Sequence, residues 1–368
     1  MATGGAERFL QRLVSMDDSN IRHRVISLSG VNSEVAVSIR NSGISVMECN
    51  ITSIAGFFAA IRLLRNVCQK ESQSIVHSWL YKANLFTTIA LVGIRVPHAW
   101  NIRQSNITFK YNKWSTVLIV YILSFLSKFR RNVDEIVYCA QLSRQSHEHA
   151  GFTKARGYVI PNGIDISEFS NHIKEKLELS SPQNSSEPIV INVGRYDIQK
   201  GHSDFLRCAA KIKQVIPHVR FQLIGRDVTP SNRELVGQIK HLDLENEVSL
   251  LGEKTNVGAY LSRSHVFLSC SAGEGWPNAL AEAMLVGLPV VHTDVGDSTM
   301  ISGTSGYSAK VGDIDAMAQS VVNVLTMSDS RYKALSSQMT LRIQQEFPLE
   351  KSVSRYIELY RRLIGGGC

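Results

Sequence analysis

Two glutamates stand eight residues apart in a stretch that is typical of an anion-binding site. Glu274 lies in a loop of small residues after the apolar run 265–269, and Glu282 lies in a predicted helix over 277–286. Pro277 suits the first position of that helix because its missing N–H costs nothing there. The helix start presents free backbone N–H groups to a phosphate, and a carboxylate can accept hydrogen bonds from vicinal hydroxyls. The stretch therefore predicts a site for a sugar or nucleotide phosphate; the alternative is a capped surface helix with one solvated glutamate.

Two cations follow another predicted strand. The β-branched run 189–193 ends at Gly194, and Arg195 and Lys200 come next in the sequence GRYDIQKG. Gly194 allows a close turn, so both cations can project from the strand end toward a dianion such as a diphosphate. Stabilising the charge of a leaving group is often the largest single contribution to catalysis. In isolation the same residues would more simply be a solvated arginine and lysine on a loop.

Charge separates the two halves of the chain. Residues 1–165 hold 19 Lys and Arg against 10 Asp and Glu, and the rest hold 21 against 22, so balances of +9 and −1 make the net +8. The asymmetry indicates an anionic partner for the first half. Because no recognition helix or RNA-binding signature is present, we expect no nucleic acid partner. Phosphate-bearing substrates and an anionic membrane surface both fit the charge.

Strand and helix signals alternate along both halves and would position these residues. The alternation predicts an α/β protein with two doubly wound domains, whose ligands bind at the carboxyl ends of parallel strands, in a cleft between the domains. The polar segment containing SSPQNSSEP has the composition of a linker. We expect a first domain over residues 1–165, a linker over 166–188, a second domain over 189–345 and a final crossover helix within 346–368.

Composition narrows the class of protein. With 44% hydrophobic and 20% charged residues, the composition is typical of a globular protein. Its six cysteines form no CxxC pair, which gives no support to a zinc site or a disulfide framework and favours the cytoplasm. The longest apolar stretch, 116–127, would span only about 18 Å as a helix, too short to cross a bilayer. We expect a core helix there, or else a helix lying at a membrane interface.

Residues 274–291, EGWPNALAEAMLVGLPVV, resemble the motif EGxPNxxxEAMxxGxPVV of the retaining glycosyltransferases of GT-B fold, in particular family 4. GRYDIQKG resembles that family's GR-x4-KG. The resemblance implies two Rossmann-like domains facing across a cleft and a nucleotide-diphosphate sugar as donor. It implies that Glu282 holds the ribose, that Glu274 contacts the donor sugar, and that Arg195 and Lys200 bind the diphosphate beside Gly194. Backbone contacts to the donor are implied for Gly275, Trp276, Pro277, Asn278 and Ala279.

Further stretches extend the resemblance over nearly the whole chain. Gly4 and Gly5 begin GGAER, which resembles a family loop whose glycines let the backbone approach a ligand at a helix start. VIPNGID at 159–165 resembles the crossover between domains, and 349–363 resembles the terminal helix that crosses back to the first domain.

The chain departs from the family pattern in two places. Only three residues precede GGAER, so we expect either that the start codon is assigned late or that the first domain lacks its first strand. Arg103 stands where many relatives carry a histidine near the reaction centre. An arginine is always protonated and cannot serve as a base, but it can bind a phosphate. His77 and His98 are the alternatives for a histidine role.

The resemblance implies a hexosyl- or N-acetylhexosaminyltransferase of bacterial surface polysaccharide synthesis (lipopolysaccharide, O antigen or capsule), needing no metal or other cofactor. Its acceptor would be a glycan, polyprenyl-diphosphate-linked or otherwise, and the protein would be cytoplasmic, in peripheral contact with the anionic inner face of the plasma membrane. Two alternatives stay open. One is a nucleotide-sugar epimerase of the same fold, and the other is a non-catalytic scaffold subunit of a polysaccharide assembly complex.

Overall fold

The computed structural model describes residues 5–16, 21–29, 34–49, 51–71, 73–109, 111–179 and 181–365. The chain forms two compact units. Unit 1 comprises Met1–Gly163 together with Leu349–Cys368, and unit 2 comprises Ile164–Pro348. The final helix, α15 (Leu349–Gly365), therefore belongs to the same unit as the beginning of the chain.

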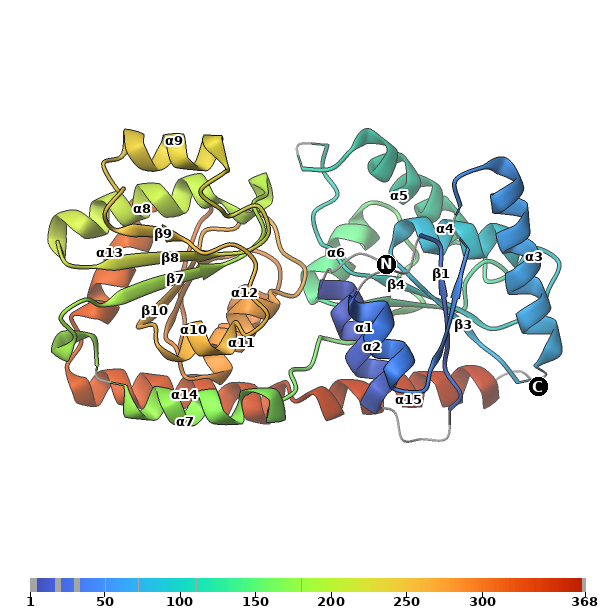
Figure 1. The fold of residues 1–368 in the computed structure, drawn as a ribbon. Helices are drawn as coiled ribbons and strands as arrows, with labels where there is room; N and C mark the ends of the chain where they lie inside the picture. Colours follow the sequence, from blue (N-terminus) through green and yellow to red (C-terminus); the bar gives the residue numbers. More distant parts are fainter. Residues whose placement is uncertain are drawn as a thin grey trace. The chain divides into compact units, whose positions relative to one another are not determined.

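Unit 2 contains a six-stranded parallel sheet in the order β12-β11-β10-β7-β8-β9 (Figure 1). Its strands are β7 (Ile189–Val193), β8 (Arg220–Ile224), β9 (Val248–Leu250), β10 (Val266–Ser269), β11 (Val290–Thr293) and β12 (Tyr307–Ala309). The sheet grows outward from β7 in one direction and from β10 in the other. This is the strand order of a Rossmann fold, in which the central pair marks the topological switch point.

Helices cover both faces of this sheet. Apolar side chains of α8 (His202–Val215), α9 (Arg233–His241) and α13 (Ile314–Leu325) pack with the strands into one buried cluster. The other helices are α10 (Gly258–Ser262), α11 (Asn278–Leu285), α12 (Ser298–Ser302) and α14 (Asp329–Glu346), with α11 packed on α10, α12 and α14. Figure 1 shows α8 and α11 on opposite faces, as expected for strands buried on both sides.

The segment expected as a linker is folded in the structure. It contains two short 3₁₀ turns, η1 (Ser167–Phe169) and η2 (Pro182–Asn184), and helix α7 (Ser170–Glu178), which packs against α10 within unit 2. Ser262 Oγ donates to Glu175 Oε2 at 2.9 Å, and buried Lys176 donates to Ser264 O and Tyr332 Oη. Polar contacts hold α7 in place, which is why its composition resembles a linker.

Unit 1 contains two parallel sheets among its described residues. One has four strands in the order β3-β4-β5-β6, and the other pairs β1 with β2. The strands are β1 (Arg24–Ser27), β2 (Ser45–Glu48), β3 (Val76–Trp79), β4 (His98–Ile102), β5 (Glu135–Tyr138) and β6 (Gly157–Val159). The expected absence of a first strand concerns residues 1–4, which lie outside the described residues.

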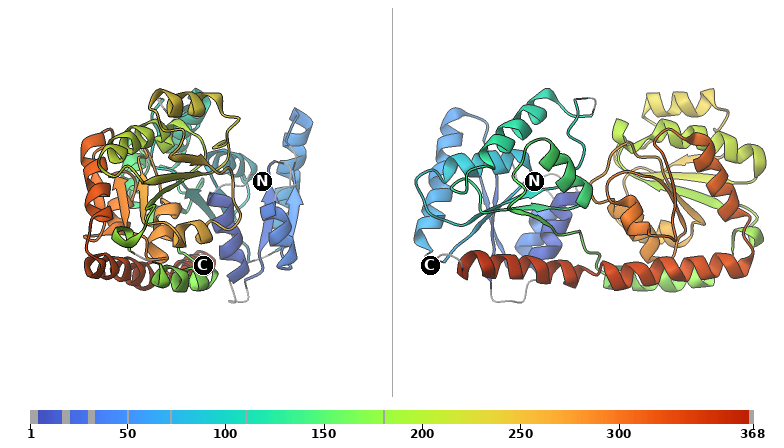
Figure 2. Two further views of the ribbon diagram at one scale, coloured as in Figure 1. Left: turned by 60° about the vertical axis from the view of Figure 1, so that its left-hand side comes forward. Right: turned by 180° about the vertical axis from the view of Figure 1, so that it is seen from behind.

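The helices of unit 1 bring together the beginning and the end of the chain. They are α1 (Gly5–Met16), α2 (Glu34–Asn41), α3 (Ile54–Lys70), α4 (Tyr81–Ala90), α5 (Trp114–Leu126), α6 (Gln141–His149) and α15. Phe9 of α1 packs in one buried cluster with Tyr356 of α15, and Figure 2 shows these two helices side by side. None of the described helices is both long enough and apolar enough to cross a membrane.

Candidate functional site

The switch point of the unit 2 sheet lies where the neighbouring strands β7 and β10 end. Their register pairs Val190 with Val266 and Ile191 with Phe267. One residue further on, Asn192 Nδ2 donates to Leu268 O at 2.8 Å. A hydrogen bond from a side chain thus joins the two strands at their carboxyl ends, where ligands of doubly wound sheets bind.

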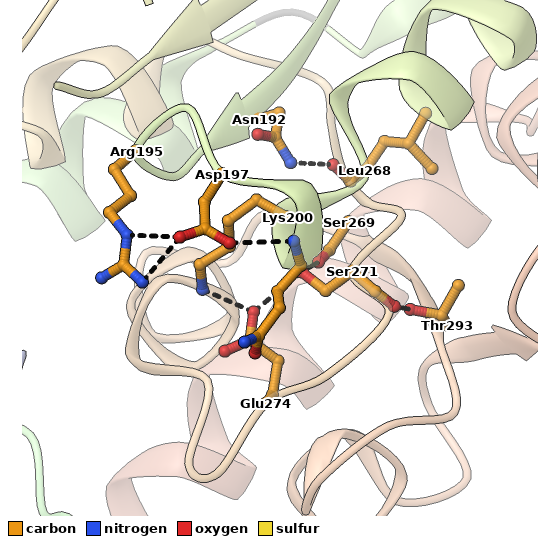
Figure 3. Close-up of polar contacts among 10 residues, drawn as sticks. Asn192, Arg195, Asp197, Lys200, Leu268, Ser269, Ser271, Glu274 and Thr293 are labelled. Carbon is orange, nitrogen blue, oxygen red and sulfur yellow. Dashed lines mark hydrogen bonds and ion pairs between the residues drawn. The ribbon is translucent and has the colours of Figure 1, made fainter. Parts of the chain in front are cut away.

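A lysine and a glutamate meet across this switch point. Lys200, from the loop after β7, donates from Nζ to Glu274 Oε1, from the loop after β10, at 2.6 Å (Figure 3). Ser271 Oγ donates to the same carboxylate oxygen at 2.8 Å. The side chains of Lys200 and Glu274 are 26% and 12% exposed, so the pair is held largely out of water but stays accessible. The two predicted motifs therefore form one site.

Arg195 is oriented by an acidic neighbour in its own loop. Its Nε and Nη2 donate to Asp197 Oδ2 at 3.1 and 2.9 Å, and the amide of Gln199 donates to Asp197 Oδ1 at 2.9 Å (Figure 3). Burial raises the pKa of Asp197, but the bonds from Gln199 and Arg195 outweigh it and leave that pKa below its ordinary value. An ionised Asp197 thus holds the half-exposed guanidinium beside the Lys200–Glu274 pair.

Two glycines let the loop after β7 approach its neighbours. A Cβ on Gly194 would lie 3.3 Å from Lys200 Cδ, so the glycine leaves room for the lysine stem. Gly201 has φ +65°, and a Cβ there would lie 1.9 Å from the carbonyl oxygen of Cys270. Only glycine fits that conformation and that approach, and it fixes the start of α8 against the end of β10.

The start of α11 differs from the expectation by one position. Pro277 is the N-cap rather than the first helical residue, and the helix begins at Asn278. Pro277 makes no side-chain cap hydrogen bond, as expected for a proline. The Glu274–Gly275 loop packs on Gly296, whose φ is +58° and where a Cβ would lie 2.5 Å from Gly275 O. The loop thus fixes the start of α11, and helix starts in general favour the binding of anions.

The other predicted residues of this stretch lie around the same helix. Trp276 is buried, and its ring packs edge-on against Phe347 at 5.0 Å between centroids. Trp276 can therefore offer a ligand its backbone, whereas its ring serves packing. Glu282 lies on α11 one turn beyond Asn278 and is half-buried.

Arg103 occupies a separate position in unit 1. It follows β4 directly, and its guanidinium lies over the rings of Phe9 and Trp79 at 4.7 and 5.1 Å while Nη2 donates to Asn162 Oδ1. Trp79 ends β3 and Asn162 follows β6, so these groups gather at the carboxyl ends of the unit 1 sheet. The predicted glycine Gly5 is the first residue of α1, the helix that supplies Phe9; Gly4 lies outside the described residues.

The two alternative histidines are tied into the core of unit 1. His77 Nδ1 lies 2.8 Å from Tyr360 Oη, and burial, with nearby His98 and Arg103, lowers its pKa to about 3. His98 Nε2 lies 2.8 Å from Thr87 Oγ1 and its Nδ1 lies 2.9 Å from Asn132 O; burial lowers its pKa to about 4. Both are neutral at physiological pH and hold neighbouring elements together.

Sequence reasoning missed several residues that shape the site. Asp197 stood inside GRYDIQKG but was given no role, and Ser271 lies two residues beyond β10, in the loop that leads to Glu274. Thr293, at the end of β11, donates to Ser271 O and so fixes the same loop. A polar residue at a strand end was a usable signal for Ser271 and Thr293. Within the described ranges, no group of three or more His, Cys, Asp or Glu residues could hold a metal ion.

Two family descriptions match most of the chain. The family described as Glycosyltransferase Family 4 matches residues 3–168, and the family described as Glycosyl transferases group 1 matches residues 187–327. The second match spans the whole Lys200–Glu274 site.

Individual proteins are similar to this chain over most of its length and most of their own. An Escherichia coli protein named UDP-Gal:alpha-D-GlcNAc-diphosphoundecaprenol alpha-1,3-galactosyltransferase is 26% identical over 88% of this chain and 84% of its own. A Campylobacter jejuni N-acetylgalactosamine-N,N'-diacetylbacillosaminyl-diphospho-undecaprenol 4-alpha-N-acetylgalactosaminyltransferase is 22% identical over 80% of this chain and 78% of its own. Among solved structures, Anabaena HepE in complex with UDP and glucose superposes with a TM-score of 0.80 at 19% identity, covering 97% of this chain and 96% of its own. The chain is therefore a glycosyltransferase of GT-B fold, with a family 4 domain followed by a group 1 domain.

Proposed function

We propose that this enzyme transfers a hexose or N-acetylhexosamine from a UDP-sugar to a lipid-linked glycan, with retention of configuration, in bacterial surface polysaccharide synthesis. The observation that carries the proposal is the 2.6 Å contact between Lys200 and Glu274 at the unit 2 switch point. A cation for a diphosphate and a carboxylate for a sugar hydroxyl lie within reach of one donor. UDP and the diphosphoundecaprenol acceptor come from the names of the relatives.

The donor would lie with its diphosphate at Arg195, Lys200 and the first amides of α11. Two cations and a helix N-terminus together stabilise the two negative charges of a diphosphate. Glu282, further along α11, would accept hydrogen bonds from the ribose hydroxyls. Since Arg195 and Lys200 already supply positive charge to the leaving group, we propose that no metal ion or other cofactor takes part.

The reaction would proceed on one face of the sugar. The bond from the anomeric carbon to the phosphate oxygen breaks, the acceptor oxygen bonds to the same carbon, and the acceptor proton passes to the departing phosphate. This route needs no protein base, and the ring nitrogens of His77 and His98 are already engaged by other groups of the protein. Glu274 would accept hydrogen bonds from the sugar hydroxyls and stabilise the positive charge that develops as the bond to phosphate lengthens.

Unit 1 would bind the acceptor. Arg103, held at the carboxyl ends of β3 and β4, would bind a phosphate of a polyprenyl-diphosphate-linked glycan. The excess of basic residues in the first 165 positions suits such an acceptor and an anionic membrane. We therefore propose a cytoplasmic protein that binds peripherally to the inner face of the plasma membrane.

Product analysis tests this proposal. The full chain is incubated with UDP-galactose, UDP-glucose or their N-acetylamino forms, with and without an undecaprenyl-diphosphate-linked monosaccharide. We expect UDP release that depends on acceptor and a product whose anomeric configuration, read by NMR, matches the donor. Conversion of one UDP-sugar into another without acceptor would indicate an epimerase. Absence of any nucleotide binding would indicate a scaffold.

A further inference from the structure

Helix α5 is apolar on all sides, yet one side of it faces solvent. Val117, Val120 and Leu123 are buried, and Val120 and Leu123 pack in the core of unit 1. The opposite side, with Phe129 just beyond the helix, exposes six large side chains: Trp114 (71%), Leu118 (50%), Tyr121 (55%), Ile122 (39%), Phe125 (60%) and Phe129 (42%). A helix that is apolar all round is normally enclosed by protein. These six residues are called the α5 stripe below.

The α5 stripe is continuous rather than scattered. At 3.6 residues per turn the five members within the helix fall within about 100° of arc, on the side away from the buried residues. Phe125 and Phe129 touch, with ring centroids 5.4 Å apart. Contiguous exposed apolar surface of this kind marks an interaction site, whereas single exposed apolar residues are ordinary.

Positive charge flanks the α5 stripe at both ends. Lys113 precedes the helix, and Lys128, Arg130 and Arg131 follow it, all with exposed side chains. The surrounding sequence holds no opposing charge, since residues 72–133 contain eight Lys and Arg and no Asp or Glu. In space, Asp134 lies 3.8 Å from Arg130, and no described ion pair engages Lys113 or Lys128. A binding partner that complements this surface would therefore be both apolar and anionic.

We propose that the α5 stripe docks the enzyme on a bilayer that contains anionic phospholipid. Tryptophan and tyrosine favour the boundary between headgroups and acyl chains, leucine and phenylalanine enter the acyl region, and lysine and arginine pair with lipid phosphates. Helix α5 has only 13 residues, so it would lie in the plane of the interface rather than cross it. Figure 1 shows α5 beside α4, with which it packs in unit 1.

The inference deepens the proposed function: membrane docking would bring the enzyme to a lipid-linked acceptor. Its biological purpose rests on the proposed function, but the docking itself does not. Vesicle binding requires no sugar, so the two can fail separately. UDP binding without vesicle binding would overturn the α5 proposal alone. Vesicle binding without UDP binding would overturn the proposed function alone.

Co-sedimentation of the full chain with vesicles tests the proposal. Vesicles of phosphatidylcholine with 30 mol% phosphatidylglycerol are expected to bind the wild type, and the double variant Leu118→Ser/Phe125→Ser should partition at least tenfold less. Leu341→Ser on α14 is the matched control, since Leu341 is 52% exposed against 50% for Leu118, and it should change partition less than twofold. Lys128→Glu should weaken binding severalfold in low salt and less in high salt, whereas Lys240→Glu on α9 should not.

Tryptophan fluorescence of the wild type provides a readout that does not depend on how well a variant folds. Trp114 is 71% exposed, whereas Trp100 and Trp276 are at most 5% exposed and Trp79 is half-buried. Vesicles with brominated acyl chains should therefore quench Trp114, and Trp114→Phe should remove the quenching. The proposal is wrong if the wild type does not bind the vesicles, or if the double variant binds equally well. It is also wrong if Leu118→Ser/Phe125→Ser converts a dimer into a monomer in solution while vesicles leave Trp114 unquenched, because a second copy would then cover the α5 stripe.

Discussion

Lys200 Nζ and Glu274 Oε1 lie 2.6 Å apart although 74 positions separate the two residues in the chain. Each extends from the carboxyl end of a central strand, and the two strands are neighbours only because the sheet order reverses between them. The contact therefore depends on the fold of unit 2 as a whole. It brings together the cation and the carboxylate of two separate motifs, at the place proposed to bind the donor.

Replacing Lys200 with alanine should impair transfer without unfolding the protein. A hydrogen bond to a charged group is worth about 1.5–3 kcal/mol, so loss of the contact to the leaving diphosphate should lower kcat/KM by about ten- to hundredfold. Steady-state UDP release measures this. Lys211→Ala is the control, because Lys211 pairs with Asp315 on the surface of unit 2, and its rate should stay within about twofold of wild type. A wild-type rate in Lys200→Ala would remove Lys200 from the diphosphate site.

Replacing Gly201 with alanine should destabilise the protein. The added Cβ would meet the Cys270 carbonyl at 1.9 Å in a backbone with φ +65°. Left-handed strain costs about 1–2 kcal/mol, and overpacking adds about 1–3 kcal/mol. Urea unfolding should therefore show a loss of about 2–5 kcal/mol. Gly312→Ala shares the positive φ, +82°, but has nothing within 4 Å, and should lose only the strain. Equal losses in the two variants would contradict the close packing at Gly201.

Lys176 should make stability depend on pH. Burial lowers the pKa of Lys176 to about 7, from an ordinary value of 10.5. Between about pH 7 and 10.5 the unfolded chain therefore holds a proton that the folded chain lacks, so stability from this group rises with pH, by up to about 1.4 kcal/mol per unit. Below pH 7 the contribution is flat. The difference in unfolding free energy between wild type and Lys176→Met should follow this slope.

The control for Lys176 lies on the same helix. Lys174 is exposed on α7, so Lys174→Met controls for the loss of a lysine side chain from this helix. A difference for Lys176→Met that does not change with pH would mean that Lys176 keeps its proton in the folded protein.

Arg103 should act on the acceptor and not on the donor. Arg103→Ala removes a guanidinium that lies against the rings of Phe9 and Trp79, and the KM for a lipid-linked acceptor should rise at least about tenfold while UDP binding stays unchanged. Arg103→Lys keeps the charge but loses the planar stacking, so it should restore only part of the affinity. Loss of UDP affinity in Arg103→Ala would place the residue in the donor site instead.

Local sequence signals located the elements that carry the two unit 2 motifs. β7 matches its predicted range, 189–193, because it is a β-branched run stopped by a glycine. The start of α11 was predicted to within one residue because proline fixes it. Local signals of this kind were enough to locate both motifs.

Contacts between residues far apart in the sequence could not be predicted from local sequence signals. The buried amine of Lys176 is stabilised by Ser264 and Tyr332, which come 88 and 156 positions later, so α7 resembled a polar linker. Arg103 was assigned by its place in a motif, but the rings that hold it come from α1 and β3. The apolar stretch 116–127 was expected to be a core helix or a helix at a membrane interface, because its composition suits both and does not reveal that one side is exposed.

Titration of the carboxylate variants with UDP by calorimetry tests the donor site most directly. Glu282→Gln keeps the shape of the side chain but weakens its bonds to ribose, so the Kd for UDP should rise by about ten- to hundredfold. Glu274→Gln should bind bare UDP within about threefold of wild type, because Glu274 is proposed to contact the sugar and not the nucleotide, yet its turnover should fall at least about tenfold. The account is contradicted if Glu282→Gln binds UDP as tightly as the wild type, or if the wild type binds no UDP at all.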